Sequence, residues 1–364
     1  MKRLSGALSA EICLLGWLGG VSSGIAGSVI AWGGGQTNTP AGLSNISSIS
    51  SSVDHTLALS SSGTVVAWGS DMDQQCDVPG GLIGVLAVAA GDYFSLALKS
   101  DGSVVAWGDN QWSQCHVPSY VTGISAISAG RTHSLALKSD GTVVAWGNND
   151  YGQCDVPPGL SGVIAVLARW NYSLALGSNG TVVGWGADDA GQIDIPGGLS
   201  NATAIGGGIN YCLALRSDGT VVGWGNYPAL PSLSSVVAIA AGEDHALALI
   251  SGGTVVAWGG NASGQTTVPS GLGNVSAIAA GWNYSLALAG GTTTFQLSQP
   301  IYSGGVFSVA VPTQPGKTYT LQYATTLNAT AWTNLPSGTG NGGVVRLSDP
   351  SSTGEKRFYR VLQQ

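Results

Sequence analysis

Charged residues are scarce in this sequence. Lysine and arginine number 12 and aspartate and glutamate 19, which makes 9% of the 364 residues charged, whereas soluble proteins average about 25%. A disordered chain combines high charge with low hydrophobicity, so this composition argues against disorder. The net charge is −7, and between residues 27 and 293 acidic residues outnumber basic ones. This acidity argues against nucleic acid as a partner, because phosphate binding needs a basic surface.

Clusters of catalytic or metal-binding residues are also missing. The 4 histidines and 5 cysteines form no Cys-x-x-Cys pair or histidine cluster of the kind that holds zinc. The sequence has no His-Glu-x-x-His motif and no nucleophile elbow. Cys76, Cys115 and Cys154 recur at one repeat position, and we expect free thiols because a disulfide needs Cα atoms within about 7 Å. We therefore predict no catalytic residue, no metal and no cofactor.

Long apolar runs are confined to the N-terminus. Lys2 and Arg3 precede an apolar stretch that is best from 12 to 21, and Gly24-Ile25-Ala26 has the small-x-small pattern of a cleavage site. The stretch is shorter than the ~20 residues of a membrane span. Residues 1–26 are therefore predicted to be a signal peptide of an exported protein, periplasmic, cell-surface or extracellular. The alternative is a poorly ordered N-terminus of a cytosolic protein.

Glycine, by contrast, is abundant, with 57 residues, and many of the glycines recur at fixed positions of a repeat. Trp-Gly occurs seven times, with the tryptophans at Trp32, Trp68, Trp107, Trp146, Trp185, Trp224 and Trp258. A Leu-Ala-Leu triplet also occurs seven times, first at Leu57 and last at Leu286. Each unit of about 39 residues holds three alternating, strand-like runs. Asp-Gly or Gly-Gly often joins the second and third runs, which suits a tight hairpin with positive φ at both turn residues.

The ends of the repeat array decide between a linear solenoid and a closed ring. The last Leu-Ala-Leu lacks the Val-Val-Ala-Trp-Gly run that should follow it, and the missing run stands instead at residues 28–33. A solenoid would end in polar capping repeats, and none is present. We therefore predict an all-β fold, a seven-bladed β-propeller over residues 27–293 that the N-terminal strand closes. The Trp-Gly tryptophans are predicted to fill the wedges between blades.

The repeat resembles that of the regulator of chromosome condensation family. The similarity lies in Trp-Gly, the loop with Gly152-Gln153 and Val156-Pro157, the Ala-Gly-x-x-His-Ser-Leu-Ala-Leu run from Ala129, and Asp-Gly-Thr-Val from Asp140. The short units and the signal peptide are closer to the exported bacterial branch typified by β-lactamase inhibitory protein type II. The resemblance implies a propeller whose loop face binds a protein partner.

The remaining residues, 294–364, lack the repeat. Short strand-like runs begin at Phe307, Tyr319, Trp332, Val344 and Phe358. This pattern predicts a small C-terminal β-sandwich. Its sequence resembles the modules that end many exported bacterial proteins. A folded spacer and a module for surface attachment or sorting remain open as its role.

In each unit three variable residues form a turn, and one further residue separates this turn from Leu-Ala-Leu. The closed ring should place all seven turns on one face. The third residue is always His, Phe or Tyr, which indicates an aromatic ring that packs against the next blade or a His that bonds the backbone. The first two residues follow no strict rule, and they include the Trp, Tyr and Arg that are enriched at binding hot spots. The predicted partner-binding residues are Asp54, Asp92, Tyr93, Arg131, Trp170, Asn171, Asn210, Glu243, Asp244, Trp282 and Asn283. A second variable loop with Trp112 and Tyr151 is expected at the rim.

Three functions remain open at this point. The first is a non-enzymatic, exported propeller that binds a protein, of which β-lactamase inhibition is a special case. The second is a module that binds carbohydrate or a cell surface, because aromatic side chains also stack on sugars. The third is a glycoside-active enzyme, which needs two carboxylates about 5–9.5 Å apart in one cleft. Glu243 and Asp244 are adjacent in sequence and are expected to diverge, so we predict that the protein is not an enzyme.

Overall fold

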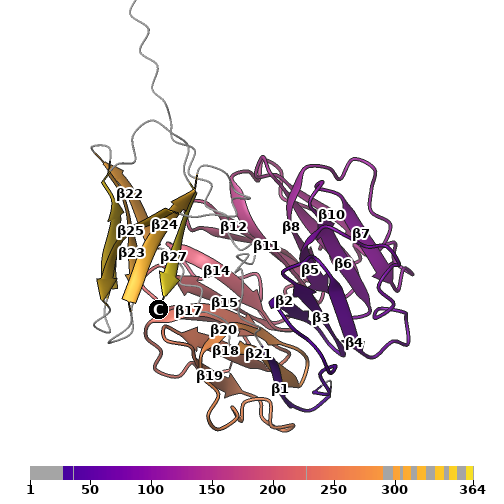
Figure 1. Cartoon of the computed structure of the whole chain (residues 1–364). Coiled ribbons are helices and arrows are strands. Elements are labelled where there is room, and N and C mark those ends of the chain that lie inside the picture. The colour runs from indigo at the N-terminus through magenta and orange to yellow at the C-terminus, as the bar shows by residue number, and fades with distance from the viewer. Residues whose placement is uncertain are drawn as a thin grey trace, which may run out of the picture. The chain divides into compact units, whose positions relative to one another are not determined.

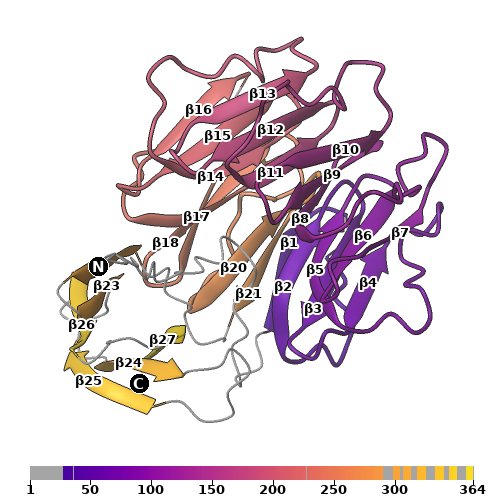
Figure 2. The same cartoon turned by 90° about the horizontal axis from the view of Figure 1, so that it is seen from above.

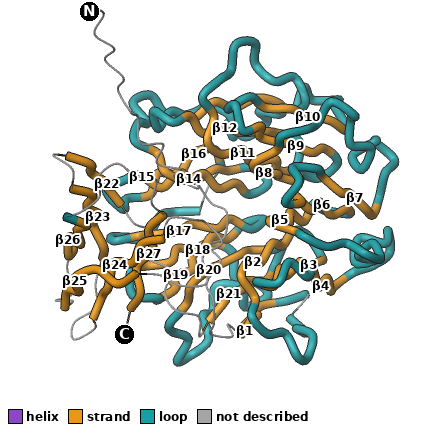
Figure 3. The backbone as a smooth tube through the Cα atoms, turned by 45° about the horizontal axis from the view of Figure 1, so that its top comes forward, coloured by secondary structure: helices purple, strands orange, loops and turns teal. Residues whose placement is uncertain are grey.

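The described part of the chain consists of strands and loops (Figures 1 and 3). The computed structural model describes residues 28–35, 37–226, 228–289, 298–303, 306–312, 318–324, 333–339, 344–350 and 358–363. The predicted signal peptide, 1–26, lies outside these residues. The chain divides into two compact units, one that contains β1 to β21 and one that contains β22 to β27, and the boundary falls between residues 292 and 293.

The first unit contains seven antiparallel sheets of three strands each, which we call blades 1 to 7. Blades 1 to 6 are β2–β4 (Ile46–Ser51, His55–Ser60, Val65–Gly69), β5–β7 (Val85–Ala90, Phe94–Lys99, Val104–Gly108), β8–β10 (Ile124–Ala129, His133–Lys138, Val143–Gly147), β11–β13 (Val163–Arg169, Tyr172–Gly177, Val182–Gly186), β14–β16 (Ala202–Gly207, Tyr211–Arg216, Val221–Gly225) and β17–β19 (Val236–Ala241, His245–Ile250, Thr254–Gly259). Blade 7 joins β20 (Val275–Ala280) and β21 (Tyr284–Ala289) to β1 (Ser28–Gly33). The all-β, seven-bladed fold is confirmed.

The ring closes through the N-terminal strand, as the repeat pattern predicts. β1 pairs antiparallel with β21 from Ser28 opposite Ala289 to Gly33 opposite Tyr284, and the two strands lie side by side in Figure 2. The first strand of each blade contacts the first strands of both neighbouring blades, and β20 contacts β2. These contacts run around the whole ring, so the first strands are the inner ones. Their small residues, such as Ala89 and Ala90, allow this close approach.

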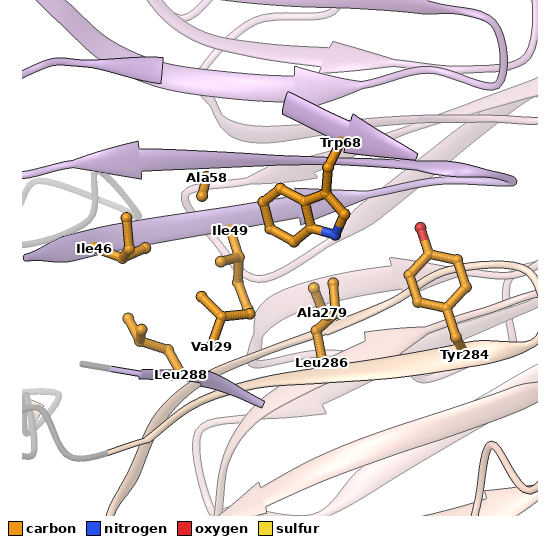
Figure 4. Packing of buried hydrophobic residues seen from close by; sticks show 9 residues of the cluster. All are labelled: Val29, Ile46, Ile49, Ala58, Trp68, Ala279, Tyr284, Leu286 and Leu288. Atoms are coloured by element: carbon orange, nitrogen blue, oxygen red, sulfur yellow. The ribbon is translucent and has the colours of Figure 1, made fainter. Parts of the chain in front are cut away.

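The Trp-Gly tryptophans are core residues between blades. All seven are at most 8% exposed. Figure 4 shows Trp68 of blade 1 in a cluster that includes Val29 and Leu286 of blade 7. In four blades the indole Nε1 also donates to the main-chain oxygen of a glutamine in the preceding loop, the pairs being Trp107 with Gln75, Trp146 with Gln114, Trp185 with Gln153 and Trp224 with Gln192. Each of these tryptophans therefore anchors a loop as well as filling a wedge.

The Asp-Gly hairpins between second and third strands differ from the expected turn. In blade 2 the loop is Ser100-Asp101-Gly102, and the amide of Lys99 donates to the oxygen of Ser103 across it. Gly102 has a φ of 77°, and Asp101 is not among the residues with positive φ. The prediction of positive φ at both turn residues holds for Gly252 and Gly253 of blade 6, with φ of 102° and 84°, but it is wrong for the Asp-Gly hairpin of blade 2. The loop has three residues, of which only the last takes the left-handed conformation that glycine tolerates.

The repeated cysteines are free, as expected. Cys76, Cys115 and Cys154 form no disulfide, and each thiol donates to a main-chain oxygen of its own loop at 3.1 to 3.2 Å. Burial, joined by nearby carboxylates, raises their pKa to about 12, so they are protonated at neutral pH. Cys212 is fully buried and donates to the oxygen of Gln192. Its place matches that of Ser134, which bonds Gln114 in the same way.

The second unit consists of two antiparallel three-stranded sheets. One sheet has the order β22 (Ser298–Ser303), β23 (Val306–Pro312), β26 (Val344–Asp349), and the other the order β25 (Thr333–Thr339), β24 (Thr318–Ala324), β27 (Phe358–Gln363). Buried Val309, Val311 and Leu347 of the first sheet pack with Tyr319 and Leu321 of the second. The unit is thus a small sandwich with its own core. Strands β23 to β27 agree with those expected from the sequence, whereas β22 was not expected.

Candidate functional site

The seven variable turns connect the first and second strands of the blades at one end of the ring. In every blade the main-chain oxygen of the second turn residue accepts a hydrogen bond from the residue after Trp-Gly. The seven pairs are Asp54 with Ser70, Tyr93 with Asp109, Thr132 with Asn148, Asn171 with Ala187, Asn210 with Asn226, Asp244 with Gly260 and Asn283 with Gly34. The scaffold thus uses the backbone of this position and leaves its side chain free to vary.

The third turn residue belongs to the scaffold. His55, His133 and His245 are fully buried, and each shares a hydrogen bond of 2.9 to 3.0 Å between Nε2 and a serine hydroxyl of the next blade. Tyr172, Tyr211 and Tyr284 instead donate to main-chain oxygens of the next blade. The predicted packing against the next blade is confirmed. The histidines bond a serine rather than the backbone, which no pattern in the sequence indicated.

The first turn residues form a ring around the axis, which we call the mouth ring. It comprises Val53, Asp92, Arg131, Trp170, Ile209, Glu243 and Trp282. Six of them, all but Arg131, line a central cavity together with Arg169. The centre of a water molecule can occupy about 10 Å³ of this cavity, which is room for roughly one water molecule. Main-chain bonds such as Trp282 N–H to the Ser52 oxygen link neighbouring turns.

Arg169 and Asp92 place two charges inside this mouth. Arg169 occupies the place of a glycine in most other blades, and its guanidinium donates across the ring to the main-chain oxygen of Ala241 at 3.1 Å. Asp92 is 4% exposed and accepts a hydrogen bond of 2.6 Å from the Ser52 hydroxyl. Burial raises the pKa of Asp92, against the opposing effects of Ser52, Arg169 and Arg131. Repeat alignment could have singled out Arg169, because it breaks the glycine rule.

Three large side chains of the mouth ring pack on one another. The Arg131 guanidinium lies 4.3 Å from the centre of the Trp170 ring, and Trp170 meets Trp282 edge to face with ring centres 6.4 Å apart. Trp170 has a φ of 42°, a left-handed conformation that costs a non-glycine residue about 1–2 kcal/mol. It is the only mouth-ring residue with positive φ. Strain of this kind is found at functional sites.

The predicted site residues fall into two groups. Asp92, Arg131, Trp170, Glu243 and Trp282 belong to the mouth ring, although Asp92 is buried and its carboxylate cannot reach a protein partner in this conformation. Asp54, Tyr93, Asn171, Asn210, Asp244 and Asn283 are second turn residues, and none of them lines the central cavity. All remain predictions as binding residues.

The two adjacent carboxylates diverge. Partial burial and the charge of Asp244 raise the pKa of Glu243, which lines the central cavity. Asp244 is exposed and accepts a hydrogen bond of 3.3 Å from Gln265 Nε2. The cavity that Glu243 shares with Asp92 has room for about one water and not for a sugar. This geometry gives no support to a glycosidase.

A larger concavity of about 430 Å³ lies next to the mouth ring, and we call it the rim groove. It is lined by Asp73, Tyr93, Asp109, Gln111, Trp112, Arg131, Thr132, Asn148, Asp150, Tyr151 and Asn171. Trp112 is 48% and Tyr151 54% exposed. The sequence pattern predicted this loop from its two aromatic residues, but it indicated neither the aspartates of the groove nor its junction with the turns. Arg131 belongs to both places, so the mouth ring and the rim groove form one continuous surface.

The repeat itself matches a known family model. The profile described as the Regulator of chromosome condensation (RCC1) repeat matches residues 46–75, 85–114, 124–153 and 236–265. Four of the seven repeats of this chain therefore match that family model. Each match runs from the first strand of a blade into the loop after Trp-Gly. No curated protein is similar enough in sequence to count as a relative.

Several solved structures share the fold. Prp20p from Saccharomyces cerevisiae, studied with its binding to Gsp1p and histones, has 20% identity and a TM-score of 0.61 over 73% of this chain and 92% of its own. Human WBSCR16 has 20% identity and a TM-score of 0.59 over 72% and 99%. The CRINKLY WD40 ectodomain of the receptor kinase ACR4 from Arabidopsis thaliana has 22% identity and a TM-score of 0.55 over 69% and 95%.

No helix of the described residues is long and apolar enough to cross a membrane.

Proposed function

We propose that this protein is an exported, non-enzymatic propeller that binds a protein partner through the mouth ring and the neighbouring second turn residues. The observation that carries the proposal is the strained Trp170, packed against Arg131 and Trp282. Equivalent positions hold Val53 and Ile209, so the fold does not require tryptophan there. Tryptophan and arginine are the residues most enriched where binding energy concentrates.

The stacked arrangement also favours binding. A large side chain held in one orientation loses little conformational entropy when a partner arrives, which raises affinity. Trp170 and Trp282 are partly exposed, so their rings are available at the surface. The solved neighbours support a protein as the ligand class, since yeast RCC1 (Prp20) is described as bound to Kap60. Export rests on the residue pattern of 1–26, and β-lactamase inhibition remains one special case.

The test is capture of a partner by the immobilised protein from the secreted proteins of its source organism, followed by mass spectrometry. We expect the double variant Trp170→Gly with Trp282→Val to lose the captured partner. Glycine suits the positive φ at position 170, and valine occupies the equivalent position 53. The variant should therefore stay folded, which circular dichroism would verify.

The matched control is Tyr120→Ala. Tyr120 is 62% exposed and lies in the stretch that leads into β8, outside the mouth ring and the rim groove. We expect this variant to capture the partner like the wild type. Equal capture by the mouth-ring variant would contradict the proposal, and so would a wild type that captures no protein.

A further inference from the structure

The rim groove is built from equivalent positions of successive blades. Asp73, Trp112 and Tyr151 are one such series, and Tyr93, Thr132 and Asn171 are another. We propose that this groove binds an extended segment of the protein partner that carries lysine or arginine side chains. The inference rests on the proposed function and names the chemistry that its second surface recognises.

The scaffold does not account for the aromatic residues of the groove. At their repeat position, the main-chain N–H donates to the side-chain oxygen of a buried glutamine in five blades. The donors are Asp73, Trp112, Tyr151, Ala190 and Ser263. The fold therefore uses only the backbone of this position, and Ala190 shows that alanine satisfies it. The exposed rings of Trp112 and Tyr151 add nothing to that bond, so their side chains are free for a ligand.

The charge of the groove is predominantly negative. Asp73, Asp109 and Asp150 line it, and Arg131 is the one basic residue among its lining residues. The Arg131 guanidinium lies over the Trp170 ring. Asp109 is held in place by Gln114 Nε2 at 2.8 Å and by the main-chain N–H of Gln111. Fixed carboxylates beside exposed aromatic rings favour a cationic side chain, which gains from both charge pairing and cation–π contact.

The shape of the groove favours a chain segment over a small molecule. Its volume of about 430 Å³ is in the range of ligand sites, but its lining comes from three turns and three loops spread over blades 1 to 4. A segment in extended conformation can follow such a row and place successive side chains against equivalent positions. A neutral oligosaccharide would use the aromatic rings but would gain nothing from the net negative charge.

The experiment measures fluorescence anisotropy of a labelled octapeptide of alternating lysine and serine with the full-length protein. A matched peptide of alternating glutamate and serine, and a neutral chito-oligosaccharide as competitor, report on charge and on sugar binding. We expect the lysine peptide to bind, the glutamate peptide not to bind, and the affinity to fall when NaCl rises to about 0.3 M, where exposed charges are screened.

Two variants map the binding to the groove. Trp112→Ala with Tyr151→Ala introduces the residue found at position 190, so it should fold and weaken the lysine peptide about tenfold or more. Asp73→Asn with Asp150→Asn should weaken it roughly fivefold. The control is Asp189→Asn with Asp218→Asn, which removes as many charges outside the groove. Asn179 already occupies the equivalent of position 218 and makes the same bonds to Thr181, so this control keeps its hairpin.

The outcomes separate this inference from the proposed function. Unchanged peptide affinity in both groove variants, or equal loss in the control, would overturn the basic-segment assignment. Displacement of the peptide by the chito-oligosaccharide, with equal affinity for the glutamate peptide, would assign the groove to sugar instead. If the groove variants bind no peptide but still capture the same protein as the wild type, the inference fails for that partner while the mouth ring remains its binding surface.

Discussion

Trp170 combines an unfavourable backbone with favourable side-chain contacts. Its φ of 42° follows from the strand before it, because β11 runs one residue longer than the other inner strands and ends at Arg169. The amide of Arg131 donates to the oxygen of Trp170, as that of Glu243 does to Trp282, whereas Asp92 bonds the oxygen of Gly130 in the neighbouring turn. Arg131 and Trp282 offset the strain by packing on the ring.

The strain at Trp170 predicts an unusual order of stability among variants. Trp170→Gly should be more stable than Trp170→Ala by about 1 kcal/mol, because the left-handed conformation is unfavourable for alanine but not for glycine. Urea unfolding followed by circular dichroism measures the difference. At Trp282, which is not among the residues with positive φ, the corresponding alanine variant should be at least as stable as the glycine variant. Equal stability of Trp170→Gly and Trp170→Ala would show that the backbone at position 170 is not strained.

Each second strand links its blade to the next through its first residue. The strand is buried over five residues in every blade, as in β9, and it begins with the third turn residue. His133 thus reaches Ser173 of blade 4, and Phe94 occupies the same position in blade 2 without a polar atom. Burial lowers the pKa of His133 to about 3 and that of His55 and His245 to about 4. These histidines are therefore neutral in the folded protein at neutral pH.

The lowered pKa of His133 makes stability depend on pH. The unfolded chain takes up a proton near pH 6.5 and the folded one near pH 3, so the contribution of His133 is complete above pH 6.5 and is lost as the pH falls toward 3. As the pH falls between those values, the unfolding free energy of the wild type should decrease more steeply than that of His133→Phe. The two slopes should differ by up to about 1.4 kcal/mol per pH unit. Urea titrations across this range measure both slopes. His116→Ala, at an exposed site, is the control, and identical slopes for His133→Phe and wild type would contradict the prediction.

The whole propeller depends on β1, because this strand completes blade 7. Val29 packs with Leu286 and Leu288 of β21, and Trp68 of blade 1 belongs to the same cluster. The ring is also joined at this point by Tyr284, whose hydroxyl donates to the oxygen of His55. The first and last parts of the propeller sequence are therefore held together by both core packing and hydrogen bonds.

Removal of β1 should open the ring. In a chain that begins after residue 33, β21 still pairs with β20 but becomes the edge strand of blade 7. Its free edge and the newly exposed apolar side chains favour aggregation. We expect earlier proteolysis within β20 and β21 and a broader thermal transition. A chain that begins at residue 27 keeps β1 and is the matched control. Limited proteolysis with mass spectrometry and calorimetry compare the two, and equal protection of blade 7 would contradict the closure.

The amino-acid sequence by itself determined the number of blades, the three strands of each, the closing strand and the buried tryptophans. These features are local patterns repeated seven times, so periodicity and alternation suffice to find them. Only the tertiary structure decided which loop residues meet. Asp92 lies in a variable turn yet is buried, because Ser52 of the neighbouring blade bonds it and Arg169 of blade 4 lines the same cavity. Equivalent repeat positions share a backbone path, but the ring geometry sets which side chains converge, and that convergence brings Trp112 and Tyr151 into one groove.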